Sequence, residues 1–336
     1  MATTYQPTRT SNAHYAENSE LASAVRRRLR IGLGQMSGRL VSAAEHAVGG
    51  SGKLLRPQLL LDACRAVAGD PASVLPAAIG TELGHIASLV HDDVIDGDNV
   101  RRGRPAVHSA FGIPLAILTG DLFVFQMFAC YVECSERGIN AERTLRAIHI
   151  LSQACIDVCR GQALEAEIAG DCDTTESTYF EVVRLKTAGV CRAAAEIGAT
   201  LGGGSPQSVS ALRGYGEALG MAFQILDDVL EYAGEPDRLG KPLDSDLRNH
   251  RVTLPLIYAL NSGSETRTSA MRWLREDSNG RAPLAALFEE RGIVARARQT
   301  ARSFTQTAQR HLRALPSTDA RERLRSYAVS LLERDR

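Results

Sequence analysis

A cluster of three acidic side chains is the clearest chemical feature of this sequence. Residues 91–96 read HDDVID, so Asp92 and Asp96 are four positions apart and Asp93 directly follows Asp92. On an α-helix, positions i and i+4 lie on the same face, which places two of the carboxylates side by side. Because stacked like charges destabilise a helix, we expect cations to hold them there. Carboxylate oxygens suit Mg²⁺, which typically binds one or two carboxylates together with substrate phosphates.

Three basic side chains follow this acidic cluster, at Arg101, Arg102 and Arg104. Planar guanidinium groups are suited to bidentate contacts with phosphate oxygens. Carboxylates that bind a metal, beside arginines that bind phosphate, predict a site for a phosphorylated substrate. Taken alone, the stretch also has a simpler interpretation, a solvated acidic helix end followed by a basic loop.

A second acidic cluster with the same spacing makes the simpler interpretation less favourable. Residues 224–232 read QILDDVLEY, in which Asp227, Asp228 and Glu231 occupy positions i, i+1 and i+4 of an apolar helix. Two such helices that face each other would form opposite walls of one metal-binding cavity.

The composition favours an all-α protein with no nucleic-acid partner. The 336 residues include 39 basic and 39 acidic side chains, so no net charge attracts nucleic acid or an anionic membrane. Abundant Ala and Leu with 5% aromatic residues favour helices. We find neither a run of about 18–20 uninterrupted apolar residues, as in a transmembrane segment, nor a signal-peptide core. The seven cysteines lie mainly in apolar helical stretches and are expected to be buried thiols, so we expect a cytoplasmic protein.

The pattern of apolar residues predicts one helical domain over residues 19–336, preceded by a disordered polar tail at 1–18. Helices are expected at about 20–48, 58–68, 73–96, 141–169, 176–202 and 207–232, followed by three amphipathic helices between 267 and 336. The Gly- and Pro-containing stretch 234–260 is expected to be a long, ordered loop that carries charges to the cavity mouth.

The chain resembles the trans-isoprenyl diphosphate synthases of the polyprenyl synthetase family, which carry two aspartate-rich motifs of the form DDxxD. The first motif is intact, whereas Glu231 stands where Asp is usual in the second. Further matching motifs are GKLLRP at 52–57, RRG at 101–103, KT at 186–187 and GKP at 240–242. The resemblance extends from about residue 20 to the end. It implies a single large helical bundle around a deep central cavity, assembled as a homodimer.

The resemblance also implies a role for each matching residue. The implied ligands of Mg²⁺, three ions per active site, are Asp92, Asp93, Asp96, Asp227, Asp228 and Glu231. The residues implied to bind isopentenyl diphosphate are Lys53, Arg56, His85 and Arg102. Those implied to bind the allylic diphosphate are Arg101, Lys186 and Lys241, and Thr187, Gln224 and Arg251 complete the substrate-binding set. Leu54 and Arg251 depart from the family pattern, since they replace Arg and Lys respectively.

The implied reaction is the condensation of isopentenyl diphosphate with an allylic prenyl diphosphate. The implied catalytic residues are Asp92, Asp96, Arg101, Lys186, Asp227 and Lys241. Two other functions remain open. One is a terpene cyclase, which ionises an allylic diphosphate without isopentenyl diphosphate, and the other is a non-catalytic subunit of a heteromeric synthase.

Small residues near the first acidic cluster predict the length of the product. Ala87 and Ser88 lie five and four positions before Asp92, on the face along which the growing chain must run. In this family, bulky aromatic residues there stop the chain at about C15, so two small residues imply geranylgeranyl diphosphate or a longer product. The residues expected to limit the chain from the facing helix are Phe125, Met127 and Phe128.

Overall fold

The structure is a computed structural model that describes residues 9–34, 36–49, 54–233, 249–275 and 281–333. The first helices are α1 (Arg9–Leu33), α2 (Arg39–Val48), α3 (Leu55–Ala66) and α4 (Pro71–Asp96), followed by a hairpin of β1 (Val100–Arg101) and β2 (Arg104–Pro105). The central elements are α5 (Val107–Phe111), α6 (Ile113–Glu136), α7 (Ala141–Glu167), α8 (Glu176–Val183), the π-helical turn η1 (Arg184–Ala188), α9 (Gly189–Leu201) and α10 (Pro206–Ala233). The last helices are α12 (Leu254–Leu260), α13 (Ser264–Arg275), α14 (Arg281–Glu290), α15 (Ile293–Leu312) and α16 (Asp319–Glu333).

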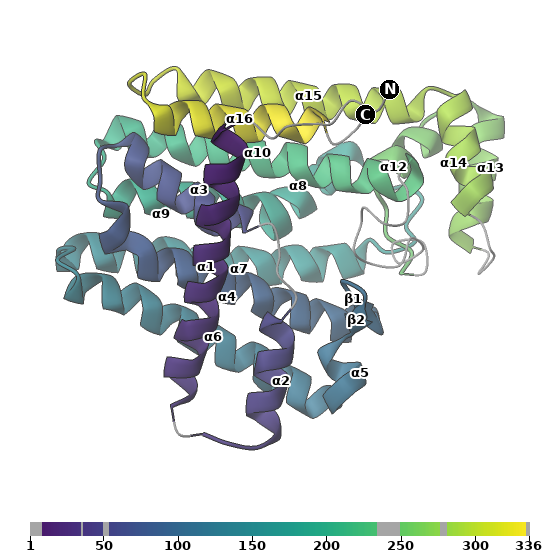
Figure 1. Cartoon of the computed structure of the whole chain (residues 1–336). Helices are drawn as coiled ribbons and strands as arrows, with labels where there is room; N and C mark the ends of the chain where they lie inside the picture. Colours follow the sequence, from purple (N-terminus) through teal and green to yellow (C-terminus); the bar gives the residue numbers. More distant parts are fainter. Residues whose placement is uncertain (1–8, 35, 50–53, 234–248, 276–280, 334–336) are drawn as a thin grey trace, which may run out of the picture.

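These helices form the bundle that the sequence predicted, which confirms the all-α fold class. Figure 1 shows α15 and α16 along α10 on one side of the bundle, with α4, α6 and α7 on the opposite side. Helix α9 packs against α3, α7 and α10, and α4 packs against α6. The paired helices bury an apolar core that is rich in Leu and Ala.

Local signals determine where the helix that carries the first acidic cluster begins and ends. The Asp70 side chain caps α4 by accepting hydrogen bonds from the backbone N–H groups of Ala72 and Ser73. Gly97 ends the helix in the left-handed conformation, with φ at 67°. Asp92 and Asp96 therefore lie on the last two turns, where α4 meets the hairpin.

Several boundaries differ from those expected. Helix α1 begins at Arg9, so residues 9–18 are helical rather than part of a disordered tail, and residues 1–8 lie outside the described residues. The helix expected at 20–48 is broken between α1 and α2, where Gly34 and Gly38 have φ of 54° and 100°. Of the expected long loop, residues 234–248 lie outside the described residues and residues 254–260 form the helix α12. The C-terminal part forms the four helices α13 to α16 rather than three.

The expected absence of a membrane span is not confirmed. Helices α4 and α6 are long and apolar enough to cross a membrane, by length and composition alone. The apolar window of α4 is 67% buried inside the bundle, as in the core helix of a globular protein, whereas that of α6 is 39% buried. The expectation of buried thiols holds for four of the seven cysteines, but Cys159 is exposed.

Candidate active site

A cavity of about 1110 Å³ runs along α4 through the middle of the bundle. Its walls come from α3, α4, α6, α7, α8, η1, α9 and α10, together with the segment 251–253. Charged side chains near the hairpin line it, and apolar side chains from α6, α7 and α9 line it as well. The cavity therefore combines a polar site with an apolar pocket.

The two acidic clusters meet at this cavity, as their spacing predicted. Asp92 and Asp96 line it from α4, and Asp227 and Asp228 line it from α10. Burial is the largest influence on Asp92 and raises the pKa of its carboxyl group, an effect that the nearby Lys186 opposes. A buried carboxylate of this kind is stabilised when a cation binds to it.

Asp93 and Glu231, two of the predicted metal ligands, do not line the cavity. Asp93 is 3% exposed and accepts a hydrogen bond of 2.7 Å from Nε of Arg101, and a second one from Nη2. Glu231 is completely buried within the packed part of α10. Asp93 is one step round α4 from Asp92 and faces other side chains, and the assignment of Asp93 and Glu231 to the metal stays a prediction.

The hairpin directs its two arginines toward the cavity. Arg101 pairs with Arg104 across the hairpin, and the two residues of the turn, Arg102 and Gly103, both have positive φ, at 53° and 72°. Two positive φ values are the feature of a type I′ turn, whose twist matches that of the strands. Arg101 and Arg102 line the cavity, and the contact with Asp93 holds Arg101 in place.

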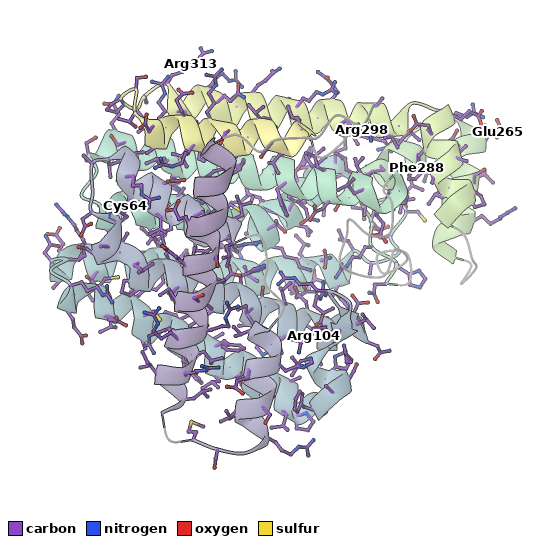
Figure 2. All side chains as sticks on the ribbon, viewed as in Figure 1. Cys64, Arg104, Glu265, Phe288, Arg298 and Arg313 are labelled. Atoms are coloured by element: carbon purple, nitrogen blue, oxygen red, sulfur yellow. The ribbon has the colours of Figure 1, made fainter. Side chains whose placement is uncertain are left out.

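Arg104, labelled in Figure 2, is not among the residues that line the cavity and contacts α2 instead. Its Nη1 donates to the backbone oxygen of His46 over 3.4 Å, and its Nη2 lies 3.1 Å from Nδ1 of the same residue. Arg104 therefore ties the hairpin to the end of α2.

Arg56 and His85 form a second polar group in the cavity. Nη1 of Arg56 lies 3.3 Å from Nε2 of His85. Burial, followed by the positive charge of Arg56, holds the pKa of His85 well below its usual value, so the neutral ring accepts this hydrogen bond. Lys53 and Lys241, which the resemblance places in the same site, lie outside the described residues.

Glu82 is a cavity residue that the sequence analysis did not identify. It is 3% exposed and lies three positions before His85, hence on nearly the same face of α4. Burial raises the pKa of its carboxyl group to about 7, against the opposing effect of Arg56 and Arg102. The sequence feature that could have identified Glu82 is the presence of an acidic residue within the apolar stretch before His85.

Lys186, Glu165 and Arg251 form a chain of charges that ends at Asp96. Nζ of Lys186 lies 2.6 Å from Oε2 of Glu165, and Nε of Arg251 lies 3.5 Å from the same oxygen. Nη2 of Arg251 donates to both carboxylate oxygens of Asp96, over 2.7 and 2.6 Å. The sequence analysis placed Lys186, Arg251 and Asp96 at the site but missed Glu165.

The close approach of α7 to η1 explains the contact between Glu165 and Lys186. A Cβ atom at Gly161 would lie 2.7 Å from the backbone nitrogen of Lys186, so only glycine lets the two elements come this close. Glu165 is one turn further along the same face of α7. The π-helical turn contains Lys186 and Thr187, and such turns are frequent at functional sites.

A hydrogen-bonded network orders the wall formed by α10. Oγ1 of Thr187 donates to Oε1 of Gln224 over 2.8 Å, and Nε2 of Gln224 donates to Asp228 over 2.8 Å. The Tyr179 hydroxyl donates to the other oxygen of Asp228 over 2.6 Å. Both oxygens of Asp228 therefore have protein partners, and the neighbouring Asp227 also lines the cavity.

The residues at the apolar end differ in part from those expected to limit the product. Ala87 and Ser88 line the cavity as predicted. Phe125 is 72% exposed on the outer face of α6, and neither it nor Phe128 reaches the cavity, so the prediction for these two is corrected. Met127, the third expected residue, lines the cavity, and so does Tyr131, which was not predicted.

The inner end of the cavity is closed by contacts between α4 and α6. The Tyr131 hydroxyl lies 2.8 Å from Oγ1 of Thr81, and the sulfur of Met127 packs directly over Gly84. Tyr131 is 1% exposed, so this contact is fully within the core.

The donor atoms fit a metal ion that also binds a phosphorylated substrate. Among the residues that the structure describes, no three His, Cys, Asp or Glu side chains come close enough to hold a metal by themselves. Asp92 and Asp96 nevertheless face the same space as Asp227 and offer only hard oxygen donors. Mg²⁺ is bound in this way, through one or two carboxylates with substrate phosphates and water in the remaining positions.

Comparison with known proteins identifies the class of protein that has this fold and site. Residues 38–290 match the family model of the polyprenyl synthetases. The chain is 37% identical over 298 residues to a short chain isoprenyl diphosphate synthase of Methanothermobacter thermautotrophicus, covering 88% of this chain and 90% of that protein. The chain belongs to the polyprenyl synthetase family.

Two solved structures extend the similarity to the whole fold. The geranylgeranyl pyrophosphate synthetase of Pyrococcus horikoshii superposes with a TM-score of 0.87 at 31% identity, covering 96% of this chain and 99% of that one. A polyprenyl synthase of Caulobacter crescentus, complexed with calcium and isoprenyl diphosphate, also has a TM-score of 0.87, at 29% identity and 97% coverage of both chains.

Proposed function

We propose that this protein is a Mg²⁺-dependent all-trans prenyltransferase that condenses isopentenyl diphosphate with an allylic diphosphate to give geranylgeranyl diphosphate or a longer product. The observation that carries the proposal is one cavity with carboxylates and cations at one end and a closed apolar pocket at the other. A diphosphate head group and a hydrocarbon tail need these two environments side by side.

The charged end of the cavity suits ionisation of the allylic substrate. Mg²⁺, which we propose as three ions per site, would supply positive charge that neutralises the departing diphosphate. Asp92, Asp96 and Asp227 would hold these ions. Arg101 and Lys186 would donate hydrogen bonds to the same diphosphate, and fixed donors of this kind stabilise developing negative charge. When the C–O bond breaks, both bonding electrons leave with the diphosphate, and the allyl group becomes a carbocation.

The second polar group suits isopentenyl diphosphate. Arg56, His85 and Arg102 line the cavity together, and we place the second diphosphate against them. Their contribution is positioning, because the double bond must face the carbocation for the new C–C bond to form. Loss of a proton to the released diphosphate then restores a neutral chain that is longer by one C5 unit.

This second group also favours chain elongation over the terpene cyclase alternative. A cyclase that does not use isopentenyl diphosphate has no need of a pocket formed by Arg56, His85 and Arg102. A non-catalytic subunit has no need of Asp92, Asp96 and Asp227 facing one cavity, and all three do so here.

We also propose that the protein is a cytoplasmic homodimer. Leu118, Phe125 and Val132 are seven residues apart on α6, hence on one face, and are 53%, 72% and 51% exposed. A row of large apolar side chains on a surface marks an interface. Light scattering should report two chains per particle, and Phe125→Lys should yield monomers. A wild-type monomer that binds lipid vesicles would show that the row contacts a membrane instead.

The test of function is a product analysis. The purified protein is incubated with Mg²⁺, isopentenyl diphosphate and an allylic diphosphate of C5, C10, C15 or C20, and the products are separated and weighed by mass spectrometry. We expect products that grow by C5 units and that need both substrates. Cyclised hydrocarbons formed from the allylic diphosphate alone would establish a cyclase in place of the prenyltransferase.

A further inference from the structure

Glu165 lies between the two cations that face the acidic end of the cavity. One of its oxygens contacts Nζ of Lys186 at 2.6 Å and Nε of Arg251 at 3.5 Å. Arg251 in turn binds both oxygens of Asp96 through Nη2. Lys186, Glu165, Arg251 and Asp96 thus form a row of alternating charge, and their side chains are only 16%, 20%, 17% and 10% exposed.

In this row, Asp96 and Lys186 contact protein side chains, whereas the proposed reaction requires them to contact Mg²⁺ and the diphosphate. Asp96 must offer an oxygen to Mg²⁺, yet both of its oxygens accept hydrogen bonds from Arg251. Lys186 must reach the diphosphate, yet Glu165 holds it. Both pairs therefore have to separate before metal and substrate bind, and a charge left without a partner in a partly buried site is destabilising.

We propose that Glu165 is a positioning residue that exchanges one cation for the other when substrate binds. The diphosphate takes Lys186 from Glu165, Glu165 then takes Arg251, and Asp96 is released to the metal. Nε of Arg251 already lies 3.5 Å from Glu165, so a small movement of one side chain completes the exchange. Each charge keeps a partner throughout. The inference rests on the proposed function, since it assigns Asp96 to Mg²⁺ and Lys186 to the diphosphate.

The exchange makes a specific prediction for metal binding in the presence of inorganic diphosphate. In Glu165→Gln, Arg251 loses the partner that draws it away, so it stays on Asp96, and the affinity for Mg²⁺ should fall about tenfold, a typical strength of coupling between sites. Arg251→Gln removes the group that covers Asp96 and should raise the affinity for Mg²⁺, most clearly without diphosphate.

Simple charge effects on Mg²⁺ would also lower its affinity in Glu165→Gln and raise it in Arg251→Gln. The double variant is therefore the decisive measurement. If Glu165 acts through Arg251, adding Glu165→Gln to Arg251→Gln should change the affinity for Mg²⁺ less than twofold. If Glu165 acts only by its charge, adding Glu165→Gln to Arg251→Gln should lower the affinity for Mg²⁺ about tenfold, as Glu165→Gln does in the wild-type protein. Residues in contact can be separated from independent ones by such a cycle.

The experiment is isothermal titration calorimetry of Mg²⁺ into each protein, with and without saturating inorganic diphosphate. Glu181→Gln is the matched control, because Glu181 pairs with Arg184 outside the cavity and the substitution makes the same change of charge. It should leave the affinity unchanged. Circular dichroism verifies that each variant is folded, and if Glu165→Gln is not folded, Glu165→Asp replaces it and should give a smaller loss in the same direction.

Three outcomes would overturn the exchange. An unchanged affinity in the single Glu165 variant, or the full loss in the double variant, would refute it while leaving the proposed function intact. Failure of the wild-type protein to bind Mg²⁺ with diphosphate would refute the metal site itself, and with it both proposals.

Discussion

Product length is the property for which the cavity makes the sharpest prediction. The perturbation is Ala87→Phe, which introduces a phenyl ring at a position that is 1% exposed and lines the cavity. We expect the wild-type protein to make mainly C20 and the variant to stop at C15 or a shorter product. The reason is overlap between the ring and the hydrocarbon tail rather than weaker affinity, because a packed interior does not accept added volume without strain.

The lengths follow from the helix geometry. Thr81, at the closed end, is eleven residues before Asp92, which corresponds to about 16 Å along α4. An extended chain advances about 1.2 Å per bond, so an isoprene unit with its four chain bonds takes about 5 Å. The cavity therefore accommodates about three units, so C15 is the longest allylic substrate that fits. Addition of one more C5 unit to this substrate gives the C20 product. Ala87 is five residues before Asp92, and a ring there leaves about 7.5 Å, the length of between one and two units, so a C15 substrate no longer fits.

Met127→Ala should act in the opposite direction by opening the closed end. Burial of a further C5 unit contributes about 4 kcal/mol, at about 0.8 kcal/mol per carbon, so elongation continues once the overlap is removed. We expect C25 to become a major product, although the lost side chain costs about 2–5 kcal/mol of stability.

The assay is mass spectrometry of products made from isopentenyl diphosphate and a C10 or C15 allylic diphosphate. Phe125→Ala is the control on the same helix, and its product should match the wild type because Phe125 points away from the cavity. Wild-type C10 or C15 would contradict this reasoning, as would an unchanged product from Ala87→Phe.

Three further predictions concern the charged end of the cavity. Asp92→Ala and Asp227→Ala should each lower kcat by about 100-fold or more while the melting temperature changes little, since each would remove a ligand of the charge-neutralising metal. If either variant kept most of its activity, the substituted residue would not belong to the site. His85→Ala should raise the KM for isopentenyl diphosphate more than that for the allylic substrate, and Lys186→Ala should do the reverse, whereas equal effects would show that the two pockets are misassigned. The third prediction is a pH dependence. The pKa of Glu82 is raised from 4.5 to about 7, so its protonated form is favoured in the folded state and its contribution to stability is lost as the pH rises through 7. Between pH 5 and 8, the free energy of unfolding measured with urea should therefore fall by up to about 3 kcal/mol in the wild type and not in Glu82→Gln. Parallel pH dependences of the two proteins would be inconsistent with burial of Glu82.

The fold and the central site followed from features that the sequence carries locally. The i, i+4 spacing of Asp92 and Asp96 and its repetition at Asp227 depend only on helix geometry, which any α-helix shares. The helix expected at 73–96 is α4, whose bounds lie within two residues of that range, and Asp70 and Gly97 cap its ends. The break between α1 and α2 was harder to predict, because glycine is tolerated in a helix until tertiary packing favours a turn.

Only the tertiary structure decided which side chains on those helices reach the cavity. Asp92 and Asp93 are adjacent in sequence, yet the rotation of α4 turns one toward the cavity and the other toward Arg101. In the same way, of the three residues predicted on α6, Met127 lines the cavity and Phe125 does not. The row from Lys186 to Asp96 joins residues from η1, α7, the segment before α12 and α4, so no local pattern indicates it. Spacing along one helix specifies which residues share a face, whereas the direction of that face depends on packing against all the other helices.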